Sequence, residues 1–172
     1  MGKILSFDIS KLLESTTGTR DNYTFEGPIV FENMKLKAPL KGEVEVMRIE
    51  EGFNVRATNV ETKVESLCDR CLKPYGQEII IKSTERIFYM NPPQECEDKA
   101  DLFMVDKKRL VVDVTEMLRQ EIILHFPPNL VCSRGCKGLC AVCGKDKNKS
   151  LCKCKEVSTE YKPLSKLKEL LK

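Results

Sequence analysis

Eight of the nine cysteines in this 172-residue chain occur as four close pairs. The pairs are Cys68 and Cys71, Cys132 and Cys136, Cys140 and Cys143, and Cys152 and Cys154. Thiolates at such short spacings can converge on a tetrahedral zinc ion, with Zn–S bonds of about 2.3 Å. A zinc ion with four thiolate ligands has no open position for a substrate. The pattern therefore predicts structural metal binding.

The spacing leaves the number of ions open between one and two. Cys140 and Cys143 are the strongest pair, because Gly144 permits a tight turn whose amides can hydrogen-bond to sulfur. In a one-ion interpretation, Cys152 and Cys154 compete with the pair Cys132 and Cys136 for the two remaining places. In a two-ion interpretation, Cys140, Cys143, Cys152 and Cys154 hold one ion, while the other four paired cysteines hold the second. Alternatively, Cys68 and Cys71 are buried thiols at the end of a strand.

The usual arrangements of catalytic residues are absent from the sequence. No thiol pair follows a strand and opens a helix in a βαβ unit, as a thioredoxin-like redox site would require. The single histidine, His125, closes an expected helix, where a structural or solvent-facing role is favoured over metal ligation. No Ser/His/Asp set or phosphate-binding glycine loop is present. We therefore expect no catalytic residues, no enzymatic activity and no small-molecule substrate.

The positive charge is concentrated at the cysteine-rich end. Residues 133–172 carry 11 Lys or Arg and 4 Asp or Glu, a net charge of +7, whereas residues 1–132 carry 18 and 22, a net charge of −4. Such a patch can contact phosphate backbones. The candidates are Arg134, Lys137, Lys145, Lys147, Lys149, Lys153 and Lys155. Alternatively, these cations partly neutralise the thiolates, since one zinc ion with four thiolates is formally −2.

Alternating apolar residues predict strands before the cysteine-rich end. The pattern begins at Tyr23 and continues through Phe25, Ile29 and Phe31. Residues 42–49 and 53–57 flank a turn at 50–52, where Gly52 supplies a positive φ. Residues 60–67 and 77–89 extend the alternation, and 102–105 and 110–112 are shorter candidates. No helical crossover separates the runs up to residue 89, so antiparallel pairing is expected among them.

Three helices and two loops complete the predicted elements. Residues 8–14 form a short helix capped by Asp8, and residues 114–125 form a second helix that begins with a capping box of Asp113 and Glu116 and ends before two prolines. A terminal helix is expected over residues 163–171, with leucines that need a covering surface. Residues 15–22 and the acidic segment 91–99, which contains the unpaired Cys96, are expected to be loops.

These elements predict an α+β fold with two parts. Residues 1–131 form the body, an antiparallel β-sheet or partly open β-barrel that carries helix 114–125. Residues 132–172 form a cysteine-rich, basic, zinc-binding module with the terminal helix. The start of the chain lacks a secretory signal, and no segment approaches the roughly 18 apolar residues of a membrane span. A cytoplasmic protein without membrane contact is expected, where cysteine pairs favour metal over disulfides.

Three blocks of the sequence together resemble the YceD family. They are CDRCLKP at residues 68–74, DVTEMLRQE at 113–121, and CKGLCAVCG at 136–144 followed by Cys152 and Cys154. At Ala141 the family pattern would have proline, and alanine softens the turn without removing a ligand. Some family members lack the C-terminal cysteines, so metal binding is expected to stabilise this branch of the family.

The resemblance implies a non-enzymatic factor that supports accumulation or maturation of the large-subunit 23S rRNA. Its expected partners are precursor rRNA, a large-subunit ribosomal protein or an rRNA-processing factor. Aromatic residues are missing between Phe126 and Tyr161, so contact with phosphates is expected rather than base readout. The rival hypothesis is a zinc-stabilised protein–protein adaptor that does not touch RNA and docks through the leucines of residues 164–171.

Overall fold

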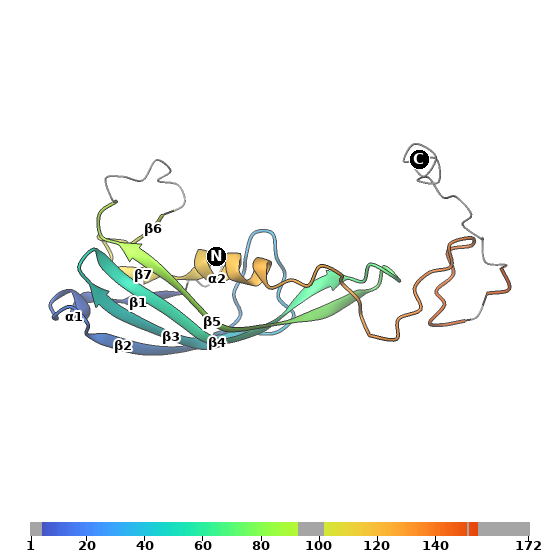
Figure 1. Ribbon diagram of the computed structural model, residues 1–172, viewed down its shortest axis with the longest axis horizontal. Coiled ribbons are helices and arrows are strands. Elements are labelled where there is room, and N and C mark those ends of the chain that lie inside the picture. The colour runs from blue at the N-terminus through green and yellow to red at the C-terminus, as the bar shows by residue number, and fades with distance from the viewer. Residues whose placement is uncertain (1–4, 93–101, 151, 155–172) are drawn as a thin grey trace, which may run out of the picture.

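The computed structural model describes residues 5–92, 102–150 and 152–154. Its main feature is a five-stranded sheet with the order β2-β3-β4-β5-β6, and β1 and β7 form a separate two-stranded sheet (Figure 1). The elements are β1 Ser6–Asp8, α1 Ser10–Leu13, β2 Arg20–Gly27, β3 Leu40–Ile49, β4 Gly52–Leu67, β5 Pro74–Tyr89, β6 Phe103–Met104, β7 Val111–Asp113 and α2 Thr115–Leu124. The large sheet is open, so the antiparallel-sheet alternative describes it and the barrel does not.

The predicted hairpin between β3 and β4 is confirmed, but its turn is one residue shorter than the predicted 50–52 because Gly52 already belongs to β4. Ile49 pairs with Gly52, so Glu50 and Glu51 alone form the turn. Gly52 has a φ of 158°. A Cβ at this position would clash with the carbonyl oxygen of Phe88 on the neighbouring strand β5. The glycine is therefore required mainly by close approach of two backbones.

A β-bulge in β4 changes which residues face the core. Between the pairs Lys41 with Glu61 and Glu43 with Thr58, strand β4 contains one extra residue, and Asn59 takes a left-handed φ of 51°. Buried positions are odd-numbered before the bulge, as at Val55 and Ala57, and even-numbered after it, as at Val60. The bulge thus keeps one face of a 16-residue strand buried along its whole length.

Helix α2 covers the buried face of the sheet (Figure 1). Met117, Leu118 and Ile122 point into the core and are fully buried. Glu121 shares this apolar face because Arg86 of β5 forms an ion pair with it at 2.5 Å. No pattern in the sequence pointed to this partner, which lies 35 residues away. At the helix end, His125 Nδ1 contacts the carbonyl oxygen of Glu121 at 2.8 Å, in line with its expected structural role.

The first predicted strand is only partly correct. Strand β2 begins at Arg20 inside the expected loop 15–22 and ends at Gly27, because Pro28 has no amide to donate to a ladder. Ile29 and Phe31, predicted to continue the strand, lie in the following loop and are buried in the same core. This loop then runs beside β4, where Leu36 forms a bridge with Val64.

Both predicted helix caps are wrong in position. The first helix begins at Ser10, with Ile9 at the cap, and α2 begins at Thr115, with Val114 at the cap. Asp8 and Asp113 belong to the paired strands β1 and β7. Their carboxylates still accept hydrogen bonds from the amides two residues later, at 2.7 and 2.9 Å. The capping box does not form, because the Glu116 carboxylate binds Arg119 and Gln120 instead.

The pairing of the last strands departs from the antiparallel pattern of the runs before residue 90. As expected, β2 to β5 pair antiparallel, but β6 pairs parallel with β5, opposite Phe88 and Tyr89. A parallel return requires a connection of about a dozen residues, which the segment 90–102 provides. The candidate strand 110–112 corresponds to β7 and pairs with β1. The predicted helix 163–171, Cys96 and most of the acidic loop 91–99 lie outside the described residues.

Replacing Gly52 by alanine tests the close approach of β4 and β5. We expect Gly52→Ala to lower the free energy of unfolding by about 1–3 kcal/mol, because the new methyl group displaces backbone. Urea unfolding monitored by circular dichroism measures this change. Gly76→Ala in β5 is the control, since a Cβ there meets only side-chain atoms at ordinary distances of 3.6–3.9 Å. Equal stability of the two variants would contradict this account.

Candidate metal centre

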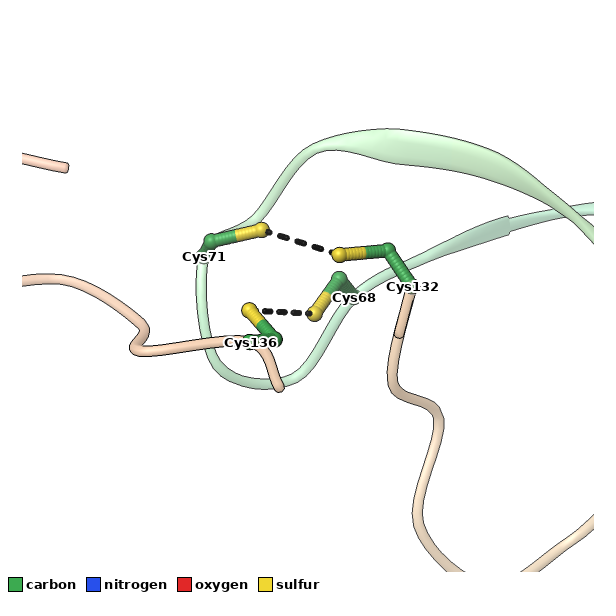
Figure 2. A group of neighbouring side chains, drawn as sticks. All are labelled: Cys68, Cys71, Cys132 and Cys136. Atoms are coloured by element: carbon green, nitrogen blue, oxygen red, sulfur yellow. Dashed lines mark hydrogen bonds between the residues drawn. The ribbon is translucent and has the colours of Figure 1, made fainter. Parts of the chain in front are cut away.

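Four cysteines from two distant segments converge at the end of the β4–β5 hairpin. Cys68 and Cys71 lie in the turn of the hairpin, and the chain that follows α2 brings Cys132 and Cys136 against them (Figure 2). The Sγ atoms of Cys68 and Cys136 are 3.8 Å apart, and those of Cys71 and Cys132 are 3.7 Å apart. These distances are far too long for a disulfide, whose S–S bond is about 2.05 Å.

The sulfur spacing fits tetrahedral zinc. Four sulfurs at about 2.3 Å from a central ion form a tetrahedron with edges of about 3.8 Å. Both measured S–S distances match this edge, and all four sulfurs lie within 4.8 Å of one another. Cys68, Cys71 and Cys136 are buried and Cys132 is exposed, so the group lies beneath the surface with one side open to solvent. The four residues could therefore hold a metal ion.

The remaining paired cysteines form a second group of the same kind. The sulfurs of Cys140, Cys143, Cys152 and Cys154 also lie within 4.8 Å of one another. The two groups have the composition of the two-ion interpretation, and no cysteine is shared between them. The structure thus brings together all eight cysteines named from the sequence, in two sets of four that could each hold a metal ion.

The two Cys-x-x-Cys pairs share one backbone conformation. In the first, the Cys68 amide donates to the Lys73 carbonyl at 2.9 Å and the Leu72 amide donates to the Cys68 carbonyl at 2.8 Å. In the second, the Cys140 amide donates to the Lys145 carbonyl at 2.8 Å and the Gly144 amide donates to the Cys140 carbonyl at 2.9 Å. Cys68 and Cys71 are buried just after the end of β4, and this shared conformation favours a common role for the two pairs.

Each Cys-x-x-Cys pair and the turn that follows it form a knuckle. In both knuckles the residue after the second cysteine has a left-handed backbone. Gly144 has a φ of 69°, which confirms the tight turn predicted from the glycine. Leu72 occupies the equivalent place with a φ of 56°. A leucine rarely adopts this conformation, and the surroundings must enforce it. Cys68 and Cys71 therefore form a second knuckle, although leucine instead of glycine follows them in the sequence.

Backbone amides aimed at sulfur lower the pKa of thiols in both groups. Burial opposes ionisation of Cys68, but the amides of Cys132, Cys71 and Arg70 outweigh it and lower its pKa to about 6. The amides of Cys143 and Val142 lower the pKa of Cys140 to about 6 as well.

Other thiols of the same groups shift in the opposite direction. Burial and the neighbouring thiols raise the pKa of Cys132 to about 12, and contact with Cys143 together with burial does the same for Cys154. Thiolates at this spacing repel one another, so a divalent cation is the natural counter-charge.

The chain after α2, whose residues 127–150 and 152–154 we call the tail, docks on the hairpin turn through several backbone contacts. The Asp69 amide donates to the Leu130 carbonyl at 2.7 Å, and the Leu130 amide donates to the Asp69 carboxylate at 2.6 Å. The Leu139 amide donates to the Arg70 carbonyl at 2.9 Å, beside Gly138, whose φ is 70°. A Cβ on Gly138 would lie 2.9 Å from that same carbonyl oxygen. Gly138 is thus required by both conformation and proximity.

A polar network joins the second group to the first. Asp146 and Asn148 lie between Cys143 and Cys152, yet Asp146 forms an ion pair with Lys73 of the hairpin at 2.6 Å. Asn148 donates from Nδ2 to Asp146 at 2.8 Å and contacts the Cys136 sulfur at 3.5 Å. Sequence reasoning did not assign these roles, although an Asp-x-Asn loop segment is typical of side chains that bond back to the backbone.

The predicted cationic residues surround the two cysteine groups. Within the described part of the chain, Arg134, Lys137, Lys145, Lys149 and Lys153 are exposed and Lys147 is half-buried. None of the six forms an ion pair with a described acidic residue. The seventh candidate, Lys155, lies outside the described residues.

Comparison with known proteins identifies the family. Residues 57–171 match the family described as large ribosomal RNA subunit accumulation protein YceD. The chain belongs to this family, which confirms the resemblance found in the sequence. The name describes an accumulation factor and not an enzyme.

A curated relative supports the assignment. The Arabidopsis thaliana protein named large ribosomal RNA subunit accumulation protein YCED homolog 1, chloroplastic, is 27% identical over 197 residues, covering 96% of this chain. The chain spans 58% of that relative's length. The search of solved structures found no match. No described helix is long and apolar enough to cross a membrane.

Replacing Gly138 by alanine tests the docking of the tail. We expect Gly138→Ala to open the contact with Arg70 and to speed amide hydrogen exchange at Leu139 by about tenfold or more, because the left-handed conformation and the carbonyl contact both exclude a methyl group. Exchange followed by NMR measures this effect. Gly135→Ala is the matched control in the same loop, where nothing lies within 4 Å of an added Cβ. Unchanged exchange in Gly138→Ala would contradict the docking role.

Proposed function

We propose that this chain is a non-enzymatic factor in cytoplasmic ribosome biogenesis, which supports accumulation or maturation of the large-subunit 23S rRNA by binding precursor rRNA or a partner in the same particle. Membership of the YceD family supports the link to large-subunit rRNA. The observation that supports the binding mode is a set of six cations around the two cysteine groups, five of them exposed and none in an ion pair with a described acidic residue. If the chain does not bind precursor rRNA itself, its partner in the particle is a large-subunit ribosomal protein or an rRNA-processing factor.

The cysteine groups bind two structural zinc ions in this proposal. Eight thiolates in two sets of four match the ligand type and the tetrahedral spacing that zinc prefers. Both sets are complete without water or substrate, so the ions supply folding energy and no reaction. The first ion fixes the tail to the hairpin turn, and the second fixes the loop that displays the lysines.

The cations then provide a phosphate-binding surface. Two such zinc sites carry a formal charge of −4, and the six described cations of the tail exceed it. These cations are attached to short loops on both sides of the knuckles, so they stay at fixed positions when the zinc ions are bound. Without aromatic residues among them, they contact the sugar–phosphate backbone and leave the bases unread.

Zinc content tests the metal assignment. We expect two zinc ions per chain in protein purified without chelator, and about one in each of the variants Cys68→Ser and Cys140→Ser, because each variant breaks one complete ligand set. Elemental analysis by inductively coupled plasma mass spectrometry gives the stoichiometry. Ser83→Ala, an exposed substitution in β5, serves as the control and should keep both ions. One ion or none in the parent chain would rule out the two-ion assignment.

Salt dependence tests the contact with RNA. We expect a 23S precursor fragment to bind the zinc-loaded chain with an affinity that falls steeply with salt, and Lys137→Ala and Lys145→Ala each to reduce the log–log slope by about 0.7–0.9. Filter binding from 50 to 300 mM KCl measures the slope. Lys41→Ala on the sheet, where Lys41 is paired with Glu61, should leave the slope unchanged. Binding insensitive to salt would contradict phosphate contact.

A protein–protein adaptor is the second candidate function. Leu67 and Leu72 at the hairpin turn and Val142 in the second knuckle are between 54 and 62% exposed. Apolar side chains at these positions suit a protein partner. The leucines of residues 164–171, on which this alternative first rested, lie outside the described residues. Recovery of a protein partner without 23S precursor, after crosslinking in cells, would favour this candidate over RNA contact.

A further inference from the structure

Both close sulfur pairs in the first cysteine group join the hairpin turn to the tail. The Sγ atoms of Cys71 and Cys132 are 3.7 Å apart, and those of Cys68 and Cys136 are 3.8 Å apart (Figure 2). The members of these pairs are separated by 61 and 68 positions in the sequence. A disulfide in either pair would therefore connect the same two segments that a bound metal ion connects.

The second cysteine group does not offer this connection. Its four members lie between residues 140 and 154, so all of them belong to the tail. A disulfide among them closes a local loop and attaches nothing to the sheet. Oxidation therefore has different structural consequences at the two groups.

Solvent access distinguishes Cys132 within the first group. It is the only one of the four cysteines that is not buried, whereas the other three are at most 4% exposed. In the proposed zinc-bound state all four sulfurs are thiolates, which are the reactive form of cysteine. Access then decides which sulfur reacts first with an oxidant in solution, and Cys71 is the sulfur that lies 3.7 Å from Cys132.

Hydrogen bonds next to this pair hold the two segments in place. Asp69 and Leu130 exchange two hydrogen bonds, one between backbone groups at 2.7 Å and one to the Asp69 carboxylate at 2.6 Å. Asp69 lies two residues before Cys71, and Leu130 lies two residues before Cys132. The two sulfurs need to approach by only about 1.7 Å to reach the disulfide bond length of about 2.05 Å.

We propose that hydrogen peroxide oxidises Cys132 and Cys71 to a disulfide, which keeps the tail attached to the hairpin after the zinc ion is released. The Cys132 thiolate attacks one peroxide oxygen, the O–O bond breaks, and the departing hydroxide takes a proton to become water. The Cys71 thiolate then attacks the sulfur of the resulting sulfenic acid, and the S–S bond forms as a second hydroxide leaves and is protonated to water. The two sulfurs together lose two electrons, and the peroxide accepts both.

Oxidation and chelation then leave the tail in different states. After the disulfide forms, only two thiolates of the first group remain, which is too few for a closed zinc site. Chelation also removes the ion, but no covalent bond replaces it. The oxidised chain therefore keeps its tail docked, whereas the chelated and reduced chain loses this attachment. The inference rests on the proposed zinc binding and does not require contact with RNA.

Disulfide mapping tests which cysteines are joined. The zinc-loaded full chain is treated with hydrogen peroxide, its free thiols are blocked with iodoacetamide, and its tryptic peptides are analysed by mass spectrometry without reduction. Trypsin cleaves after Arg70 and Arg134, so each cysteine of the first group lies in a separate peptide. We expect the peptide of Cys71 to be linked to the peptide of Cys132 in the monomeric chain.

The matched control for the mapping is Cys96→Ser, which removes the unpaired cysteine and should leave the linked peptides unchanged. Any other pairing within the first group, such as a bond inside either segment, overturns the inference. A bond between two chains, or oxidation of Cys132 without any disulfide, overturns it as well.

Amide hydrogen exchange tests whether the disulfide keeps the tail docked. The Asp69 amide, which donates to the Leu130 carbonyl, is the probe. We expect its exchange rate in the oxidised chain to stay within about twofold of the zinc-loaded chain, and to rise by about tenfold or more in the chelated and reduced chain. The amide of Val55, buried in the core, is the control and should exchange equally in all three samples. Fast exchange at Asp69 in the oxidised chain would overturn the inference.

Elemental analysis of the starting sample separates this inference from the zinc assignment. A sample without zinc contradicts both, because the thiolates of the first group are then not held by an ion. A zinc-loaded sample that forms other disulfides, or that releases its tail on oxidation, contradicts the inference alone.

Discussion

The convergence of Cys68 and Cys71 with Cys132 and Cys136 is the contact on which the tertiary structure of the tail depends. After Phe126 the described tail has few buried apolar side chains, and the small cluster beside these cysteines is separate from the main core. Segments of this kind cannot offset the entropy of ordering by apolar burial. In the proposed zinc-bound state, sulfur atoms at the spacing of a tetrahedral ligand set supply the missing attachment, since metal binding free energy becomes folding free energy.

The second cysteine group extends the first rather than standing alone. Lys73 follows the first knuckle and bonds to Asp146, which follows the second, so each knuckle contributes a residue to the contact between them. Asn148 adds a donor to the Cys136 sulfur, as outer-shell residues often do at metal sites. The exposed lysines of the second loop are thereby held relative to the hairpin, and through it to the sheet.

The sequence predicted what depends on local periodicity and spacing. Alternation located β3, β4 and β5, because one face of each strand is buried, and cysteine spacing located all eight converging thiols. It missed what depends on contacts between distant segments. Arg86, which pairs with Glu121, and the bulge at Asn59 have no local signature. The caps moved because Asp8 and Asp113 are claimed by β1 and β7, a pairing of residues more than 100 positions apart.

The length of the β4–β5 hairpin has a consequence for how stability is distributed. Each strand has 16 residues, so the turn lies about 50 Å from the start of the hairpin. The main core ends before the turn, whose cysteines belong to the separate cluster. The two ends therefore unfold by losing different contacts. The sheet unfolds when its core is exposed, whereas the turn and the tail unfold when the cysteine contacts are lost. A protease would first cleave the tail of a chain whose cysteines no longer converge, and would leave the sheet intact.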